Sequence, residues 1–171
     1  KQAIPYLIKI LEDTKQEPMV RHEAAEALGA IGSKKAMDVL KKYLSDPVIE
    51  VAETCELAIE RLNWLQTNDM PTNVSENPYN SVDPAPPAPF SSVEQLKQVL
   101  LDDSASLFER YRAMFTLRNL RTKEAIQALG TALKHGSALF RHEIAFVLGQ
   151  IQDQESVPYL KDSLEDSSEN E

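Results

Sequence analysis

The 171-residue sequence is poor in the residues that sheets, disulfide frameworks and membrane spans require. Only 6% of its residues are aromatic and only five are glycine, and runs that alternate apolar and polar residues are rare. This composition favours helices over a sheet. A single cysteine, Cys55, excludes an internal disulfide. No apolar stretch approaches the roughly 20 residues of a membrane-spanning helix, so we expect no membrane span. With the composition above, we predict an all-α protein.

Charge narrows the classes of partner. The net charge is −9, and an acidic field disfavours DNA and RNA while attracting cationic partners such as a lysine-rich protein loop. We therefore expect no nucleic-acid partner. No charged-then-apolar pattern follows Lys1, so we expect no signal peptide. Cys55 lies in a helical pattern, where a small buried residue is expected rather than a reactive thiol. We expect a cytoplasmic protein. Since a helical pattern is already established at Ala3, we also expect a piece of a longer protein.

A proline-rich segment divides the sequence. Residues 67–91 contain six of the ten prolines and no lysine or arginine. Proline removes amide donors and favours extended backbone, so this segment is predicted to be a linker. The predicted organisation is an N-terminal half at 1–66, a linker at 67–91 and a C-terminal half at 92–171, which ends in an acidic tail.

Both halves show paired amphipathic helices. Leu7 and Leu40 are 33 positions apart, and Leu129 and Leu160 are 31 apart. A two-helix unit with a period near 30 is typical of a solenoid, in which each unit buries its apolar face against its neighbours. The predicted first helices are Ala3–Asp13, Ala36–Ser45, Ala125–Lys134 and Val157–Leu164, and their partners are Val20–Ile31, Val48–Leu65, Phe108–Leu120 and Phe140–Ile151. The pattern VRxxAAxALGxIG resembles HEAT repeats, so the predicted fold is an all-α solenoid of HEAT-type repeats.

Two of the partner helices carry the same polar triplet. The segments PMVRHEAAEALGAIG, from Pro18, and ALFRHEIAFVLGQIQ, from Ala138, align with a constant offset of 120, which matches Arg-His-Glu at 21–23 with Arg-His-Glu at 141–143. Stacking explains the matched small and apolar residues, but it does not require a titratable pair. The other two partner helices have Val-Ala at 51–52 and Tyr-Arg at 111–112 in these positions, so the repeat itself does not impose His-Glu.

Histidine nitrogen and carboxylate oxygen together suit iron, manganese or zinc, and the lack of thiolates argues against a structural zinc cage. Adjacent residues diverge by about 100° on a helix, so His and Glu converge on one ion only if they lie in the first turn and the glutamate reaches back. Otherwise, one ligates and the other binds substrate or orients a ligand. Glu26 follows His22 by four residues, but Phe146 replaces it in the copy, so it ranks below Glu23. His135 has no counterpart and is expected to be solvated at a helix end.

The sequence closely resembles the deoxyhypusine hydroxylase family. The resemblance extends over most of the chain and rests on MVRHEAAEALGAIG, DPVIEVAETCELAIERL, SVDPAPPA, LFERYRAMFTLRN and SALFRHEIAFVLGQIQ. It implies a HEAT-repeat monooxygenase that uses two iron ions and O₂ to hydroxylate the deoxyhypusine side chain of the hypusine-containing translation factor. The family carries four His-Glu motifs, of which this sequence holds two. The outer two are expected before Lys1 and after Glu171.

The resemblance also implies roles for individual residues. The implied metal ligands are His22, Glu23, His142 and Glu143, with the first two on one iron and His142 on the other. Glu143 is implied to be catalytic, facing the substrate amine or supporting the metal. The implied substrate-binding residues are Glu143, Gly149, Met19 and Gly29.

Two ligands to one ion and one to the other fall short of a complete site, so we expect negligible metal affinity and no turnover for this chain alone. The alternatives are a non-catalytic HEAT scaffold that binds a protein partner and a HEAT-repeat pigment lyase. The scaffold leaves the repeated His-Glu pairs unexplained, and no feature of the sequence indicates the chromophore pocket of the lyase.

Overall fold

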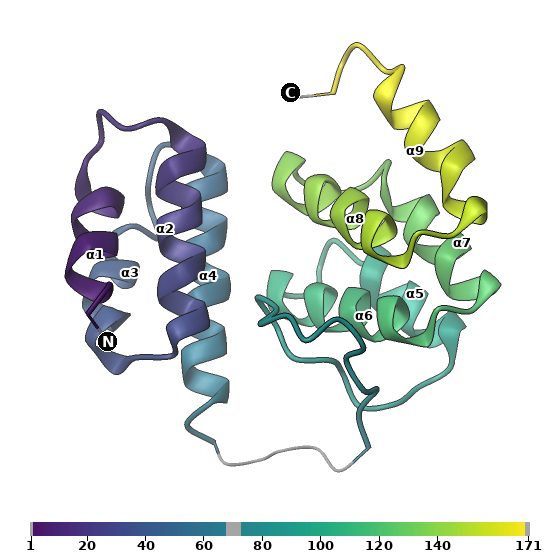
Figure 1. The fold of residues 1–171 in the computed structure, drawn as a ribbon, viewed down its shortest axis with the longest axis horizontal. Coiled ribbons are helices and arrows are strands. Elements are labelled where there is room, and N and C mark those ends of the chain that lie inside the picture. Colours follow the sequence, from purple (N-terminus) through teal and green to yellow (C-terminus); the bar gives the residue numbers. More distant parts are fainter. Residues whose placement is uncertain (1, 68–72, 170–171) are drawn as a thin grey trace. The chain divides into compact units, whose positions relative to one another are not determined.

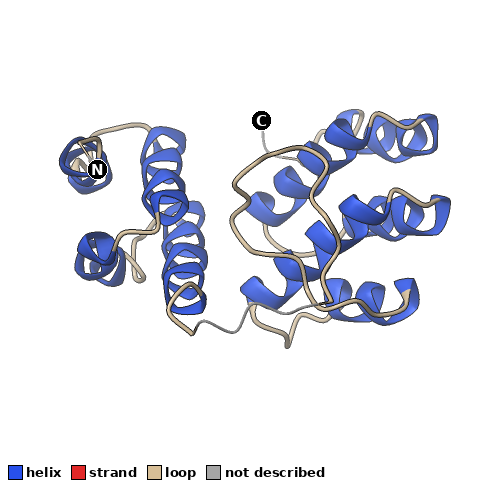
Figure 2. Ribbon diagram, turned by 60° about the horizontal axis from the view of Figure 1, so that its bottom comes forward, coloured by secondary structure: helices blue, strands red, loops and turns tan. Residues whose placement is uncertain are grey.

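The computed structural model describes residues 2–67 and 73–169, and every regular element in these ranges is helical. Figure 2 shows coiled ribbons joined by loops, and an isolated bridge between Val74 and Pro89 is the nearest approach to strand pairing in the described residues. The all-α prediction is therefore confirmed. Of the described helices, none combines the length and apolar content needed to cross a bilayer.

The chain forms two compact units. Unit 1 comprises Lys1–Met70 with Val82–Pro86, and unit 2 comprises Pro71–Ser81 with Pro87–Glu171. The described part of the predicted linker is thus divided between the units, while residues 68–72 of that linker and 170–171 of the acidic tail lie outside the described residues. The linker boundaries remain a prediction.

Unit 1 contains two helix pairs. They are α1 (Ile4–Glu12) with α2 (Pro18–Ile31) and α3 (Met37–Lys42) with α4 (Ile49–Trp64), and a 3₁₀ turn at Lys34–Ala36 precedes α3. The two long helices, α2 and α4, pack side by side and form one layer. Helices α1 and α3 form a second layer on one side of them (Figure 1). Pro18 begins α2 without losing a helical hydrogen bond, and Gly32 ends it in the left-handed conformation, with φ of 71°.

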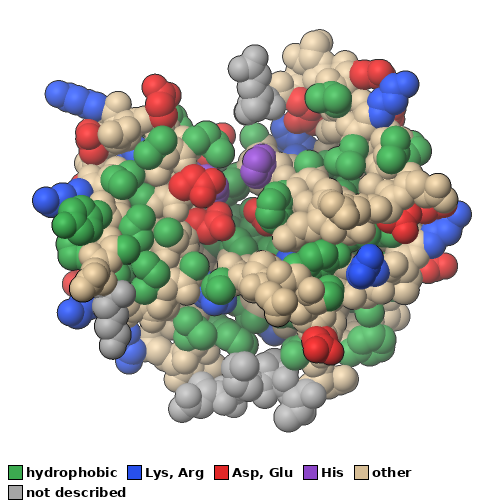
Figure 3. Space-filling model, viewed as in Figure 1, with side chains coloured by type: hydrophobic (Ala, Val, Ile, Leu, Met, Phe, Trp, Pro, Cys, Tyr) green, Lys and Arg blue, Asp and Glu red, His purple; other side chains and the backbone are tan. Residues whose placement is uncertain are grey.

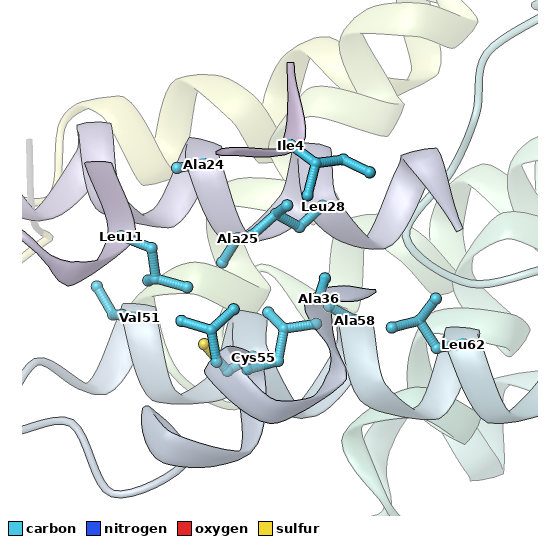
Figure 4. Packing of buried hydrophobic residues seen from close by; sticks show 12 residues of the cluster. Ile4, Leu11, Ala24, Ala25, Leu28, Ala36, Val51, Cys55, Ala58 and Leu62 are labelled. Atoms are coloured by element: carbon cyan, nitrogen blue, oxygen red, sulfur yellow. The ribbon is translucent and has the colours of Figure 1, made fainter. Parts of the chain in front are cut away.

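The core of unit 1 lies between these four helices. It is a cluster of buried apolar side chains from all four helices, which includes Ile4, Leu11, Ala25, Leu28, Leu40, Val51, Ala58 and Leu62. Figure 4 labels members of this cluster on α1, α2 and α4. Cys55 is fully buried in this cluster, and burial raises the pKa of its thiol to about 12. The prediction that Cys55 is a core residue is confirmed.

Unit 2 stacks further pairs of the same kind. They are α5 (Val93–Leu101) with α6 (Leu107–Leu120), α7 (Lys123–Ala132) with α8 (Ala138–Ile151), and then a 3₁₀ turn at Gln154–Ser156 followed by α9 (Val157–Leu164). Neighbouring pairs pack on each other through α5 with α7 and α6 with α8. Two parts of the proline-rich segment lie against this unit. The Ala88 amide donates to Thr116 Oγ1 at 2.8 Å, and Asn119 Nδ2 donates to Ser75 Oγ at 3.1 Å.

Helix α5 was not among the predicted helices. Its start directly follows the prolines, although a full capping box between Ser92 and Gln95 marks the position. The spacing of Leu96 and Leu100, both buried, was the second available signal. The proline-rich composition of the preceding segment thus concealed the capping and leucine pattern of this helix.

An arginine anchors the first turn of α2 and of α6. Arg21 Nε donates to the Leu11 carbonyl at 3.0 Å, and Arg110 Nε donates to the Leu100 carbonyl at the same distance. Each guanidinium thereby donates to a carbonyl at the end of the preceding helix, where the helix itself offers that carbonyl no amide donor. Arg21 also pairs with Asp46, and both side chains are almost fully buried. The arginine of the first triplet, Arg21, therefore has a structural role in unit 1, and its neighbours His22 and Glu23 remain to be explained by function.

Candidate metal centre

His22 is held between α2 and α4. Its side chain is 5% exposed, and its Nδ1 lies 2.6 Å from Thr54 Oγ1 of α4. Its other ring nitrogen, Nε2, lies 3.9 Å from Glu23 Oε1 and 3.7 Å from Glu26 Oε2. A buried imidazole thus turns one nitrogen toward a hydroxyl and the other toward two carboxylates.

The helix starts differ from the prediction. Helices α2 and α8 begin at Pro18 and Ala138, two residues before the predicted Val20 and Phe140. Each His-Glu pair therefore lies in the second turn and not in the first. Whether such a pair converges on one ion stays a prediction. In α2 the glutamate reaches within 3.9 Å of the imidazole from the second turn because the Glu23 side chain, 68% exposed, has room to bend back.

Glu26 is the less exposed of the two carboxylates, at 34%. Burial raises the pKa of its carboxyl, and the negative charges of Glu23 and Asp83 raise it further. The distance from His22 places Glu26 as close to the imidazole as Glu23, so geometry gives no reason to exclude it. The ranking of Glu23 above Glu26 remains a prediction.

Sequence reasoning did not identify Thr54 or Asp83. Thr54 had a weak signal, since it follows Glu50 by four residues and a threonine hydroxyl can bond back to that carbonyl. Asp83 lies in the proline-rich segment, and its effect on Glu26 depends on packing within unit 1 that no local pattern reveals.

In unit 2 the equivalent pair is arranged differently. His142 is exposed, whereas Glu143 is buried at 9% exposure. Glu143 lies on the stripe of α8 that faces α6, since Phe140 contacts Tyr111 at one end and Gln150 Oε1 lies 3.1 Å from Arg118 Nη1 at the other. Residues three and four apart share a helix face, so the glutamate between these two contacts also faces α6.

The predicted substrate-binding residues lie in different surroundings. Gly29 is buried against α4, and a Cβ there would come within 2.9 Å of Ala58 Cβ. Gly149 is exposed, and a Cβ there would meet nothing within 4 Å. Met19 is half-exposed, at 47%. Gly29 therefore has a packing reason to be glycine, while the described residues give none for Gly149. A role in substrate binding stays a prediction for all three.

The donor atoms around His22 fit a metal ion. Two ligands that each lie about 2.0–2.2 Å from one ion are at most roughly 4.4 Å apart. The separations of 3.9 Å and 3.7 Å from Nε2 to the carboxylate oxygens are within this limit. Nitrogen and oxygen ligands suit iron, manganese or zinc. Within residues 2–67 and 73–169, however, no group of three or more His, Cys, Asp or Glu side chains gathers to form a complete site.

A family model described as HEAT repeats matches residues 1–60 and 93–171. The chain belongs to the HEAT-repeat family, and the predicted fold class is confirmed. The chain is also 60% identical over 172 residues to the deoxyhypusine hydroxylase of Danio rerio, and 57% identical to those of Drosophila melanogaster and Homo sapiens. These alignments cover 99% of the chain but only 55–56% of each relative.

A solved structure agrees with these relatives. The structure of human deoxyhypusine hydroxylase in complex with glycerol matches with a TM-score of 0.92 and 57% identity, over 99% of this chain and 58% of that one. The predicted resemblance to deoxyhypusine hydroxylase is therefore confirmed. The chain spans about half the length of the curated relatives it matches.

Proposed function

We propose that this chain supplies the middle repeats of a deoxyhypusine hydroxylase. The observation that carries the proposal is the buried imidazole of His22, whose Nε2 faces the carboxylates of Glu23 and Glu26. The recurrence of His-Glu in α8 and the identity of 57–60% with proteins of that name support it. The proposed reaction is hydroxylation of the deoxyhypusine side chain with O₂ at two iron ions.

The proposed ligands divide between the units. His22 and Glu23 would hold one iron, and His142 would hold the other. Bound iron would supply the activation of O₂ that allows one oxygen atom to enter a C–H bond of the substrate. The protein's part would be to fix the ligands before metal arrives, and the packing of His22 between α2 and α4 supports such a role for this residue.

Glu143 is proposed to have a catalytic role in which its carboxylate binds the terminal amine of the substrate. Deoxyhypusine is a lysine extended by an aminobutyl group, so its terminal ammonium requires a counter-charge. A carboxylate at 9% exposure is little screened by solvent, which strengthens a charge-assisted hydrogen bond to such an amine. Gly149, Met19 and Gly29 are proposed to line the approach of that side chain, and Glu143 could alternatively support the second iron.

The proposed partner is a basic protein loop on the hypusine-containing translation factor. The net charge of −9 favours the approach of such a loop and disfavours nucleic acid. On the face that Figure 3 shows, basic side chains are scattered among acidic and apolar ones. A cytoplasmic location is proposed with this function.

A non-catalytic scaffold is the rival function. It accounts for the helical repeats, but it gives no reason for His22 to point a buried nitrogen at two carboxylates. A pigment lyase would require a chromophore site, which no feature of the sequence indicates.

The experiment is a chimera in which this chain replaces the matching part of the Danio rerio hydroxylase. We expect iron in the purified chimera and a mass gain of one oxygen atom on the deoxyhypusine-containing factor. His22→Ala or His142→Ala should abolish hydroxylation and lower the iron content while the helix content remains. The matched control is His135→Ala, which should change neither. Unchanged iron after both substitutions would favour the scaffold.

The chain by itself is expected to bind metal negligibly, because the proposed assignment gives it fewer than three ligands for either ion. Metal analysis of the isolated chain after incubation with Fe²⁺ tests this. Stoichiometric binding of two irons by the isolated chain would show that the ligand assignment is wrong.

A further inference from the structure

The hydrogen bonds behind His22 define where its proton lies. Thr54 Oγ1 is 2.7 Å from the Glu50 carbonyl and 2.6 Å from His22 Nδ1. A carbonyl oxygen only accepts, so the single hydroxyl hydrogen of Thr54 is used in the bond to Glu50. The hydroxyl oxygen must then accept the second bond, and His22 Nδ1 must donate it.

We propose that Thr54 is a positioning residue that fixes His22 as the Nδ1–H tautomer. In this form the lone pair is on Nε2, the nitrogen that faces the carboxylates of Glu23 and Glu26. A metal ion requires that lone pair, because a protonated nitrogen cannot ligate. The consequence for metal binding rests on the proposed function, whereas the tautomer itself does not.

The packing of α2 on α4 makes this contact possible. Gly29 lies seven residues after His22, and Ala58 lies four residues after Thr54, so the two pairs share facing stripes. The Cα of Ala58 is only 3.1 Å from where a Cβ on Gly29 would stand. This close approach lets a side chain as short as threonine reach the imidazole. Burial of both groups, at 2% and 4% exposure, excludes the water that would compete for Nδ1.

A purely structural role would not select a tautomer. A buried histidine can satisfy a hydrogen bond through either nitrogen, and a hydroxyl can donate as well as accept. The bond from Thr54 to the Glu50 carbonyl removes that freedom. The experiment must therefore determine which ring nitrogen of His22 carries the proton, because a measurement of stability alone would not distinguish the two roles.

The experiment is long-range ¹H–¹⁵N spectroscopy of the metal-free chain, labelled with ¹⁵N-histidine, at alkaline pH where an ordinary histidine is neutral. The chain has three histidines, and a His22→Asn variant assigns the signals. We expect the proton on Nδ1 of His22. Thr54→Val should move the proton to Nε2 or give a mixture, while Thr54→Ser, which keeps the hydroxyl, should restore Nδ1–H.

The matched control is Thr116→Val in unit 2. Thr116 is also fully buried and also bonds back four residues, to the Arg112 carbonyl at 2.9 Å, but it accepts from a backbone amide and not from an imidazole. Its loss should leave the His22 spectrum unchanged. If Thr54→Val loses helix content, Thr54→Ala is measured in its place with the same expectation.

In the iron-binding chimera, Thr54→Val should weaken the apparent Fe²⁺ affinity about 10- to 100-fold, and Thr54→Ser should weaken it much less. An Nε2–H signal in the unsubstituted chain, or a His22 tautomer that Thr54→Val leaves unchanged, overturns the proposal. Failure of the proposed function is distinguishable, since it would appear as an unsubstituted chimera without iron, whatever the tautomer.

Discussion

Helices α2 and α8 carry the same Arg-His-Glu triplet at the same helical position, but each buries the residue that the other exposes. His22 is buried and Glu23 exposed, whereas His142 is exposed and Glu143 buried. The stripe that starts at the histidine faces the following long helix of its unit, as the contacts of His22 with α4 show. The stripe that includes the glutamate faces the preceding long helix, as the contacts of α8 with α6 show.

The position in the repeat determines the direction in which a side chain points, whereas the neighbouring long helix determines whether that side chain is buried. In unit 1, α4 follows α2 and covers the histidine stripe. In unit 2, α6 precedes α8 and covers the glutamate stripe. Identical residues at identical positions therefore differ in solvation and strength of interaction. Different roles for Glu23 and Glu143 are physically reasonable for this reason.

The largest expected contrast is between the two arginines of the triplets. Arg21→Ala should destabilise unit 1 by about 3 kcal/mol, because it leaves the Asp46 carboxylate, 1% exposed, without its partner. Arg141 pairs with Glu169, and both side chains are over 20% exposed. Arg141→Ala should therefore cost about 1 kcal/mol or less.

Urea denaturation measures both variants. The single tryptophan, Trp64, and the single cysteine, Cys55, both lie in α4, so fluorescence and thiol labelling report on unit 1 specifically. Hydrogen exchange of peptides from α8 reports on unit 2. Equal effects of the two substitutions would contradict the difference in burial.

The next contrast is between Gly29 and Gly149. Gly29→Ala should destabilise unit 1 by about 1–3 kcal/mol, since the new methyl group would meet Ala58 Cβ at 2.9 Å and force α2 away from α4. Gly149→Ala meets nothing and should stabilise α8 by up to about 1 kcal/mol through helix propensity. Thermal unfolding followed by circular dichroism gives the sign of each change.

The same pair also tests function in the chimera. If Gly149 lines the substrate's approach, Gly149→Ala should lower hydroxylation although it stabilises the helix. Loss of activity in proportion to lost stability in both variants would instead indicate that the two glycines act only through packing.

The helices and their pairing could be predicted because each pattern is local. Spacing of apolar residues and the period near 30 identified eight helices and the solenoid, and the offset of 120 identified the paired triplets. Helix α5 was not predicted, because the prolines before Ser92 indicate a linker and its capping box is a weaker local signal.

The environment of the candidate site could not be predicted in the same way. The bond from His22 to Thr54 joins residues 32 apart, and the effect of Asp83 on Glu26 joins residues 57 apart in sequence. Such contacts depend on how closely two helices approach and on where the proline-rich segment packs. Neither quantity is encoded in a local pattern, so sequence indicated which residues matter but not what surrounds them.

The smallest expected contrast is in how much stability each unit loses at acidic pH. Hydrogen bonds from the Arg21 side chain hold the pKa of Asp46 below its usual value. A carboxyl with a lowered pKa in the folded state stabilises that state above its unfolded-state pKa and loses the contribution as the pH falls through its folded-state pKa. Unit 1 should therefore lose stability below about pH 4, and Asp46→Asn should flatten this dependence while lowering stability at neutral pH. Trp64 fluorescence across a pH series of urea titrations measures it.

Unit 2 provides the matched control for acid. Hydrogen bonds from Ser168 and Lys134 also lower the pKa of Asp166, but that carboxylate is 37% exposed and its lysine partner 48%. Solvent and salt screen such a pair, so Asp166→Asn should change the acid dependence less than Asp46→Asn does, and added salt should remove what difference it makes. A larger effect from Asp166 would mean that burial does not decide the strength of these pairs, and the comparison between the two units would lose its physical basis.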